Sequence, residues 1–322
     1  MNMATVDLVL LRMQHVLDSQ QLRLLKEVLT SVEPNQPAEQ RADNPRILQL
    51  FLTAKEVEGC SARTIEYYRS TLEHMTAWLG KPYLHATSDE LRRYLSEYEE
   101  TRHTSKVTID NIRRIMSTFF SWLEEEDYVV KSPMRKIHRI KTPTRTKDVL
   151  TDEELERLRS TCRNLRDLAI IDMLASTGMR VGELVGLDRS DINLQERECV
   201  VTGKGNKQRP VYFDARTKLH LTAYLSSRTD SSPALFVALS GTQGRLTTGS
   251  VGSRIRKIGQ AAGVNHVHPH KFRRTLATHA IDKGMPIEQV QRLLGHAKIE
   301  TTMHYAMVDQ SNVKASHRRY LE

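Results

Sequence analysis

The spacing of apolar residues predicts a chain built mainly of helices. Between residues 45 and 130, hydrophobic side chains recur every three or four positions, as on the buried face of an amphipathic helix. The first such face combines Ile47, Leu48, Phe51 and Leu52. Further helices are expected to begin near Ser61, Ser88 and Thr104. Four or five helices with short connections form a small bundle, so we expect residues 45–130 to be one helical domain.

The first 44 residues differ from the predicted bundle. Residues 5–32 have helical spacing in two short segments, and Asp18 or Ser19 could cap the second. Residues 33–44 are polar and contain Pro34 and Pro37, which predicts a linker. The simplest interpretation of residues 1–32 is a helical hairpin folded on its own domain, and docking on a neighbouring copy is the alternative.

From residue 149 onward the pattern predicts helices mixed with a little β structure. Thr151 and Glu154 are spaced as a capping box, and two helices are expected after them. Residues 199–202 and 210–213 are short runs of strand-forming side chains. The segment between them, residues 203–209, has the turn chemistry of a hairpin. The predicted fold class is therefore mainly α with a small antiparallel β-sheet in a C-terminal domain, residues 149–322.

Composition adds limits on the class of protein. The chain has 322 residues, of which 39% are hydrophobic, so two or three domains are expected. No apolar run approaches the length of a membrane span, and the N-terminus lacks a signal-peptide pattern. Three cysteines, at positions 60, 162 and 199, are widely spaced and odd in number, which favours reduced thiols. We therefore expect a cytoplasmic protein, associated with the nucleoid if it binds DNA.

The charge favours a polyanionic partner. The formal net charge is +9 and the pI is about 9.4, which favours nucleic acid over an anionic membrane because no lipidation motif is present. Residues 131–148 read either as a solvated linker or as a linker that contacts phosphates, and Pro133 and Pro143 are expected to keep it extended. The predicted DNA contacts are Arg135, Lys141, Arg145, Lys147 and, in the hairpin, Lys207.

Candidate chemistry is found at the junctions between predicted elements. Arg180 follows Gly178 at a helix start, Lys204 lies at the hairpin tip, and His270 and Arg273 are one turn apart on a helix. His296 follows a predicted glycine helix cap at Gly295, and Tyr305 comes nine residues later. Two guanidiniums can hold phosphate oxygens, lysine can protonate a leaving group, and histidine can accept the proton of a tyrosine nucleophile. The set therefore suits phosphoryl transfer.

Each of these residues also has an ordinary structural interpretation. Arg180 could form an intrahelical ion pair with Glu183, Lys204 could be an exposed turn lysine, and His270 could be a capping residue. A metal site is not predicted, since the C-terminal histidines lack carboxylates or cysteines at ligand spacing; they are His268, His270, His279, His296 and His304. The ordered set, and no single member of it, therefore indicates phosphoryl transfer.

Four stretches of the C-terminal domain resemble the tyrosine recombinase (phage integrase) family, and its Xer-like and mobile-element integrase branches most. They are residues 177–187 (TGMRVGELVGL), 201–209 (VTGKGNKQR), 270–279 (HKFRRTLATH) and 293–305 (LLGHAKIETTMHY). The predicted helical bundle, including residues 61–68 (SARTIEYY), is similar to the family's core-binding domain. The resemblance extends over about 280 residues. Phe272 stands where the family usually has leucine, and the N-terminal extension is not typical of the Xer pair.

The resemblance implies a role for each residue of the set. Arg180 and Arg273 would bind the scissile phosphate, with Glu183 supporting the arginines. Lys204 would be the general acid on the 5′ oxygen, and His270 and His296 would assist proton transfer. Tyr305 would attack and form a 3′-phosphotyrosine bond. Because that bond conserves the energy of the phosphodiester, the resemblance implies neither ATP nor a metal.

The resemblance also implies partners and leaves alternatives. The family recombines two DNA duplexes within a tetramer, in which tails such as residues 306–322 pack on the next protomer. A second, heterologous recombinase or an accessory DNA-bending protein would be a further partner. Alternative functions are strand relaxation by a type IB topoisomerase and a catalytically silent DNA-binding regulator. Integration, excision and resolution of chromosomes or plasmids all remain open.

Overall fold

The chain divides into two compact units, residues 1–145 and 146–322. A computed structural model describes residues 9–31, 44–142, 148–203, 207–241, 243–303 and 305. Within the described residues, no helix combines the length and the apolar character that a bilayer crossing requires.

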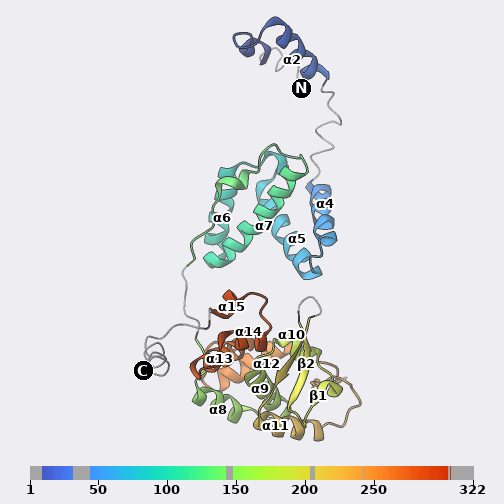
Figure 1. Ribbon diagram of the computed structural model, residues 1–322, viewed down its shortest axis with the longest axis vertical. Helices are drawn as coiled ribbons and strands as arrows, with labels where there is room; N and C mark the ends of the chain where they lie inside the picture. The colour runs from blue at the N-terminus through green and yellow to red at the C-terminus, as the bar shows by residue number, and fades with distance from the viewer. Residues whose placement is uncertain are drawn as a thin grey trace. The chain divides into compact units, whose positions relative to one another are not determined.

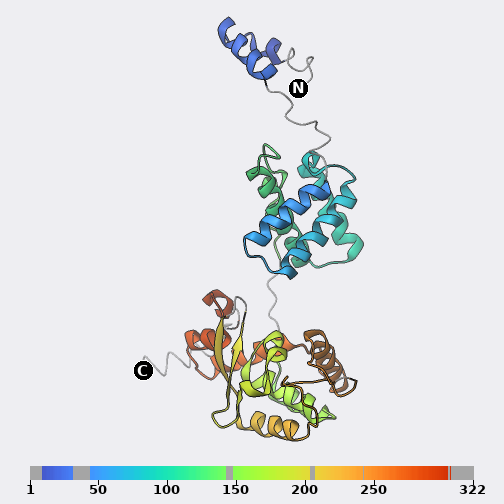
Figure 2. The ribbon, with the colours of Figure 1, turned by 90° about the vertical axis from the view of Figure 1, so that its right-hand side faces the viewer.

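The first unit is a bundle of helices, as the apolar spacing predicted (Figure 1). It begins with α2 (Ser19–Ser31), whose backbone is capped by Asp18. The bundle itself comprises α4 (Asn44–Val57), α5 (Ala62–Leu79), η1 (Tyr83–His85), α6 (Ser88–Arg102), α7 (Lys106–Glu125) and η2 (Pro133–Lys136). In Figure 2, α4 and α5 are the two blue helices that cross at the front of this bundle, where they pack on each other.

Aromatic side chains fill the centre of the bundle. The ring of Phe51, on α4, lies 5.1 Å from that of Phe119 and 5.5 Å from that of Trp122, both on α7. Tyr83 adds a third element, with its ring centroid 4.7 Å from that of Phe119. This core therefore joins the first and last long helices through residues that are far apart in sequence.

Part of the predicted basic linker packs on this bundle. Met134 is buried, and the buried carboxylate of Asp110 on α7 accepts a hydrogen bond from the backbone N–H of Ile140 at 3.1 Å. The expectation that Pro133 keeps the segment extended is wrong, because Pro133 opens the 3-10 helix η2 and the Ser132 hydroxyl accepts from the N–H of Met134. Proline is favourable at a first helical position, where its missing N–H is not needed. Pro143 lies outside the described residues.

The second unit combines helices with a three-stranded antiparallel sheet of order β1-β2-β3. Its strands are β1 (Ile192–Asn193), β2 (Glu198–Thr202) and β3 (Gln208–Tyr212), and β2 pairs with β3 in the register Val201↔Arg209. Its helical elements are α8 (Asp152–Thr161), α9 (Leu165–Thr177), α10 (Val181–Gly186), η3 (Arg189–Asp191), α11 (Ala215–Ser226), α12 (Thr248–Ala261), α13 (Pro269–Asp282), α14 (Ile287–Leu294) and α15 (Ile299–Met303). The predicted hairpin and fold class are confirmed.

Helix α9 is the centre of this unit, with α8, α11 and α13 packed around it (Figure 1). It is the most apolar helix of the unit, and its Ile170, Ile171 and Leu174 are almost fully buried. Cys199, on β2, is buried in the same core, whereas Cys60 and Cys162 are half-buried; all three are free thiols. The turn at the end of this buried helix leads directly to α10.

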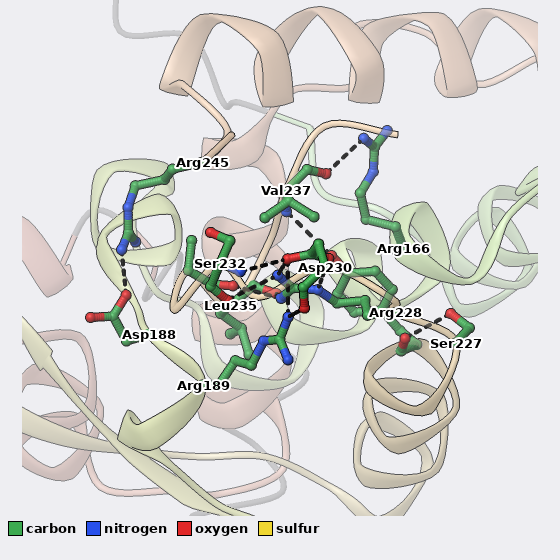
Figure 3. A network of polar contacts seen from close by, with 12 residues as sticks. Arg166, Asp188, Arg189, Ser227, Arg228, Asp230, Ser232, Leu235, Val237 and Arg245 are labelled. Atoms are coloured by element: carbon green, nitrogen blue, oxygen red, sulfur yellow. Dashed lines mark hydrogen bonds and ion pairs between the residues drawn. The ribbon is translucent and has the colours of Figure 1, made fainter. Parts of the chain in front are cut away.

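A network of arginines fixes the far end of α10 (Figure 3). Arg245 donates to the carbonyls of Val185 and Leu187 at 2.8 and 2.9 Å, which satisfies the last carbonyl groups of that short helix. Arg228 is 3% exposed and donates to Asp230 and to the carbonyls of Ala234 and Leu235. These contacts hold the loop after α11 in place, and Arg245 extends from that loop to α10.

Candidate active site

The turn between α9 and α10 places Arg180. Gly178 ends α9 in the left-handed conformation, with φ of 61°. A Cβ atom there would lie 2.6 Å from Cδ2 of Leu276 on α13, so a glycine is required. Arg180 is the next residue but one and precedes the first turn of α10. Its guanidinium is 38% exposed, which leaves it accessible to a ligand.

Glu183 joins Arg180 to Arg209, an arginine on β3. Its buried carboxylate accepts from the backbone N–H and Nη1 of Arg180, each at 2.8 Å. It also accepts from Nη1 and Nη2 of Arg209, at 2.9 and 2.8 Å. Burial alone would raise the pKa of Glu183, but the hydrogen bonds from Arg209 and Arg180 hold that pKa at about 2. Glu183 is therefore a carboxylate at neutral pH.

Arg273 projects from α13 toward the same place and is 3% exposed. Its Nη1 donates to the carbonyl of Gly178 at 2.8 Å, and its Nη2 donates to the carbonyl of Leu294 at 2.5 Å. Burial, together with the nearby guanidiniums of Arg180 and Arg209, lowers the pKa of Arg273 to about 10. The side chain therefore remains charged at neutral pH within a strongly positive environment.

The end of α14 brings a histidine and a tyrosine together. Gly295 terminates the helix with φ of 65°, as its position in the sequence predicted. His296 follows, and its ring stacks on that of Tyr305 with centroids 5.9 Å apart. The Nδ1 atom of His296 lies 2.9 Å from Oγ1 of the buried Thr302, so Nε2 is the ring nitrogen left for another partner. Burial and the guanidiniums of Arg273 and Arg180 lower the pKa of His296 to about 4.

Tyr305 is half-buried and packs on a small apolar cluster that contains Ala277, Val290 and Leu294. His270 is exposed in the first turn of α13, one turn before Arg273. The protein packed around its ring and the charge of Arg273 lower the pKa of His270, so this imidazole is neutral at pH 7 and can accept a proton.

The structure therefore brings together Arg180, Glu183, Arg273, His296 and Tyr305, with His270 on the helix of Arg273. Lys204 lies outside the described residues; Gly203, just before it, is beside Glu183, since a Cβ atom there would be 3.4 Å from Oε1. Arg209 and Thr302 were missed by the sequence analysis. Arg209 ends one of the stretches quoted for the resemblance, which is the signal that could have indicated it.

The predicted DNA-contacting cations have separate locations. Arg135 belongs to the first unit, where it is 60% exposed and its Nη1 lies 3.3 Å from Glu124. Lys141 and Lys207 are exposed, the latter directly before β3. Arg145 and Lys147 lie outside the described residues. The assignment of these cations to DNA stays a prediction.

Taken by its chemistry, the site can hold an oxyanion. The guanidiniums of Arg180, Arg209 and Arg273 surround the carboxylate of Glu183, so positive charge exceeds negative charge among these groups. An anion placed there would offset the repulsion between the guanidiniums. It would also cancel the field that lowers the pKa of His296. The tyrosine hydroxyl beside that field is a nucleophile that such a site can activate.

Comparison with known proteins gives the same family for both units. Residues 148–312 match the model described as "Phage integrase family", and residues 47–129 match "Phage integrase, N-terminal SAM-like domain". The tyrosine recombinase XerC of Oceanobacillus iheyensis is 30% identical over 289 residues, which cover 84% of this chain and 94% of that protein. The tyrosine recombinase XerA of Pyrococcus horikoshii is 31% identical over 274 residues, which cover 84% of this chain and 92% of that protein.

Solved structures share the fold. The Tn1549 transposon integrase in complex with transposon right end DNA has a TM-score of 0.72 at 18% identity, covering 86% of this chain and 99% of that one. The XerH site-specific recombinase bound to palindromic difH substrate has a TM-score of 0.66 at 21% identity, covering 83% of each chain. Both likenesses show the fold alone.

Proposed function

The chain belongs to the phage integrase family of tyrosine recombinases, and from this premise we propose that it performs site-specific recombination of DNA with Tyr305 as its nucleophile. The observation that carries the proposal is the stacking of Tyr305 on His296 within a cluster of guanidiniums. Relatives captured on DNA, such as the Tn1549 integrase and XerH, support a DNA substrate.

Cleavage begins when the scissile phosphate binds between Arg180 and Arg273. Arg273 uses two of its N–H groups on backbone carbonyls, and the remaining donors of its guanidinium are left for phosphate oxygens. The Tyr305 hydroxyl then forms a bond to phosphorus while the bond from phosphorus to the 5′ oxygen breaks. As negative charge grows on the non-bridging oxygens, the two guanidiniums stabilise it.

Two proton transfers accompany this step. The tyrosine proton passes to a neutral imidazole, for which His296 is best placed because its ring lies against Tyr305. Its pKa of about 4 in the free protein reflects burial and the surrounding guanidiniums, so binding of the phosphate anion raises its basicity at the moment it is needed. The departing 5′ oxygen takes a proton from Lys204.

The covalent intermediate keeps the energy of one phosphodiester, so a 5′ hydroxyl of a second duplex can reverse the reaction and exchange strands. We place this exchange in a tetramer on two recombination sites. Strand relaxation by a single protomer is the alternative, and it is separated by the product. A recombinase joins two linear duplexes that carry its site, whereas a topoisomerase changes only the linking number of a supercoiled plasmid.

The test uses a nicked duplex in which cleavage releases a short 5′ fragment and traps the protein on DNA. The wild-type chain should form a covalent complex that survives denaturation, and Tyr305→Phe should bind the duplex without forming it. Tyr212→Phe is the matched control, since Tyr212 is an exposed tyrosine on β3 of the same unit. A covalent complex retained by Tyr305→Phe would overturn the proposal.

A further inference from the structure

Arg209 makes contacts that its position in the sequence does not suggest. Its side chain is 11% exposed and uses all three nitrogens on protein oxygens. Nη1 and Nη2 donate to the two oxygens of Glu183 at 2.9 and 2.8 Å. Nε donates to the carbonyl of Leu293 at 3.1 Å. One side chain thereby links β3, α10 and the end of α14.

The contact with α14 is close as well as polar. A Cβ atom on Gly295 would lie 2.8 Å from Cδ of Arg209 and 3.1 Å from its Nε. The turn that carries His296 therefore rests directly on the Arg209 side chain, and only a glycine leaves room for it. A shift of Arg209 would move both the turn before His296 and the carboxylate that holds Arg180.

Two roles for Arg209 can be separated by the contacts it makes. A phosphate ligand keeps its guanidinium open to the ligand, as Arg180 does at 38% exposure. Arg209 is instead enclosed, with each nitrogen bound to protein. Its charge nevertheless acts on the site, since Arg209 is among the groups that lower the pKa of both Arg273 and His296.

We propose that Arg209 is a positioning residue of the recombination site, which fixes the Glu183–Arg180 pair at a set place relative to His296 at the end of α14. The two halves of the site come from segments far apart in the chain, and Arg209 bonds to both. This inference rests on the proposed function. It adds a residue that touches neither the nucleophile nor the phosphate.

An arginine is required for this role by geometry. Its planar fork presents Nη1 and Nη2 to both carboxylate oxygens while Nε points to a third acceptor. A lysine has the same charge but a single nitrogen, so it can keep one of these contacts at a time. Arg209→Lys therefore preserves the local charge and removes the connection between the two halves.

The test compares Arg209→Lys with Arg159→Lys. Arg159 is a fair control because it is 14% exposed in the same unit and donates from Nε to the buried Asp172 at 2.6 Å, on α9. Each variant is saturated on the nicked duplex, and the rate of covalent complex formation, the affinity for intact duplex and the thermal midpoint are measured. We expect Arg209→Lys to cleave about 10²-fold more slowly, as misplacement by about 1 Å can cause, with duplex affinity retained. Arg159→Lys should cleave at the wild-type rate.

A double variant shows whether Arg209 acts through Glu183. If it does, Arg209→Lys combined with Glu183→Gln should be no slower than the slower single variant, because the two changes break one connection. Losses that multiply would refute that route. An equal loss of cleavage in Arg159→Lys, or a wild-type rate in Arg209→Lys, would refute the positioning role. A wild-type chain without any phosphotyrosine complex would instead refute the proposed function.

Discussion

Glu183→Gln is the change that tests the electrostatics of the site most directly. Glu183 is buried and accepts hydrogen bonds from Arg180 and Arg209 through both carboxylate oxygens. Glutamine keeps the size of the side chain, loses the charge, and replaces one acceptor oxygen with a donor amide. That amide faces guanidinium groups that can only donate.

The size of the effect is set by the pKa of Glu183. A fall from an ordinary 4.5 to about 2 corresponds to about 3 kcal/mol of stability at neutral pH, at about 1.4 kcal/mol for each pKa unit. Removing one partner of a buried ion pair typically costs about 3–5 kcal/mol, which agrees. Because the folded pKa lies below the unfolded one, this stabilisation is complete above about pH 5 and is lost as the pH falls toward 2. By about pH 3 roughly half of it should remain.

Urea unfolding of the full chain measures this, with two probes that separate the units. Both tryptophans, Trp78 and Trp122, belong to the first unit, so their fluorescence reports that unit and far-UV circular dichroism reports both. Glu183→Gln should shift the transition of the second unit and leave the fluorescence transition unchanged. The matched control is Glu156→Gln, which also removes a carboxylate shared by two arginines, Arg159 and Arg216, but one that is 57% exposed.

The control should lose less than about 1 kcal/mol, because solvent screens exposed ion pairs. The difference between the wild type and Glu183→Gln should be about 3 kcal/mol near pH 7 and should shrink in acid. A deficit that stays constant between about pH 7 and pH 3 would mean that the carboxylate charge is not its source. A deficit no larger than that of Glu156→Gln would refute the reasoning from burial.

Three further predictions concern the reaction and the DNA. Arg273→Ala should slow covalent complex formation by about 10²–10³-fold while duplex affinity changes little, and equal losses in both assays would make Arg273 structural. A 5′-bridging phosphorothiolate, whose leaving group needs no proton, should restore cleavage by Lys204→Ala but not by Tyr305→Phe; a Lys204→Ala variant that stays slow would exclude it as the acid. Loss of three linker cations should lower the log–log salt dependence of binding by about 0.9 for each phosphate contact, and an unchanged slope would leave the segment as a solvated tether; that variant combines Arg135→Ala, Lys141→Ala and Arg145→Ala.

Features decided by neighbouring residues could be predicted from the sequence. Thr151 and Glu154 form the expected capping box, because both partners lie within one turn of the helix start. Gly295 ends α14 as expected, because a left-handed residue there favours glycine whatever packs against it. The hairpin of β2 and β3 is set by turn chemistry in the same way. These local rules set where His296 and Arg180 stand on their helices.

Features decided by distant contacts could not be predicted. Arg209 lies 26 positions from Glu183 and 84 from Leu293, so no local pattern marks it as buried, and an arginine in a strand is ordinarily a surface residue. The failed expectation for Pro133 has a similar cause. The path of residues 132–140 depends on Met134 reaching the core and on Asp110, 30 positions earlier, which receives the N–H of Ile140.

The site is assembled from helix ends, and this explains why so many of its groups are cationic. The last carbonyls of a helix lack partners within the helix and carry partial negative charge. At the end of α14, Arg209 binds the carbonyl of Leu293 and Arg273 binds that of Leu294. The positive charge that the proposed phosphate needs is thus first anchored on backbone. Because a guanidinium has five N–H donors, Arg273 can hold the segment before His296 with one group and face an oxyanion with others. Displacement of that segment would leave Arg273 without an acceptor, so the docking of the tyrosine-bearing segment and the charge of the site are physically linked.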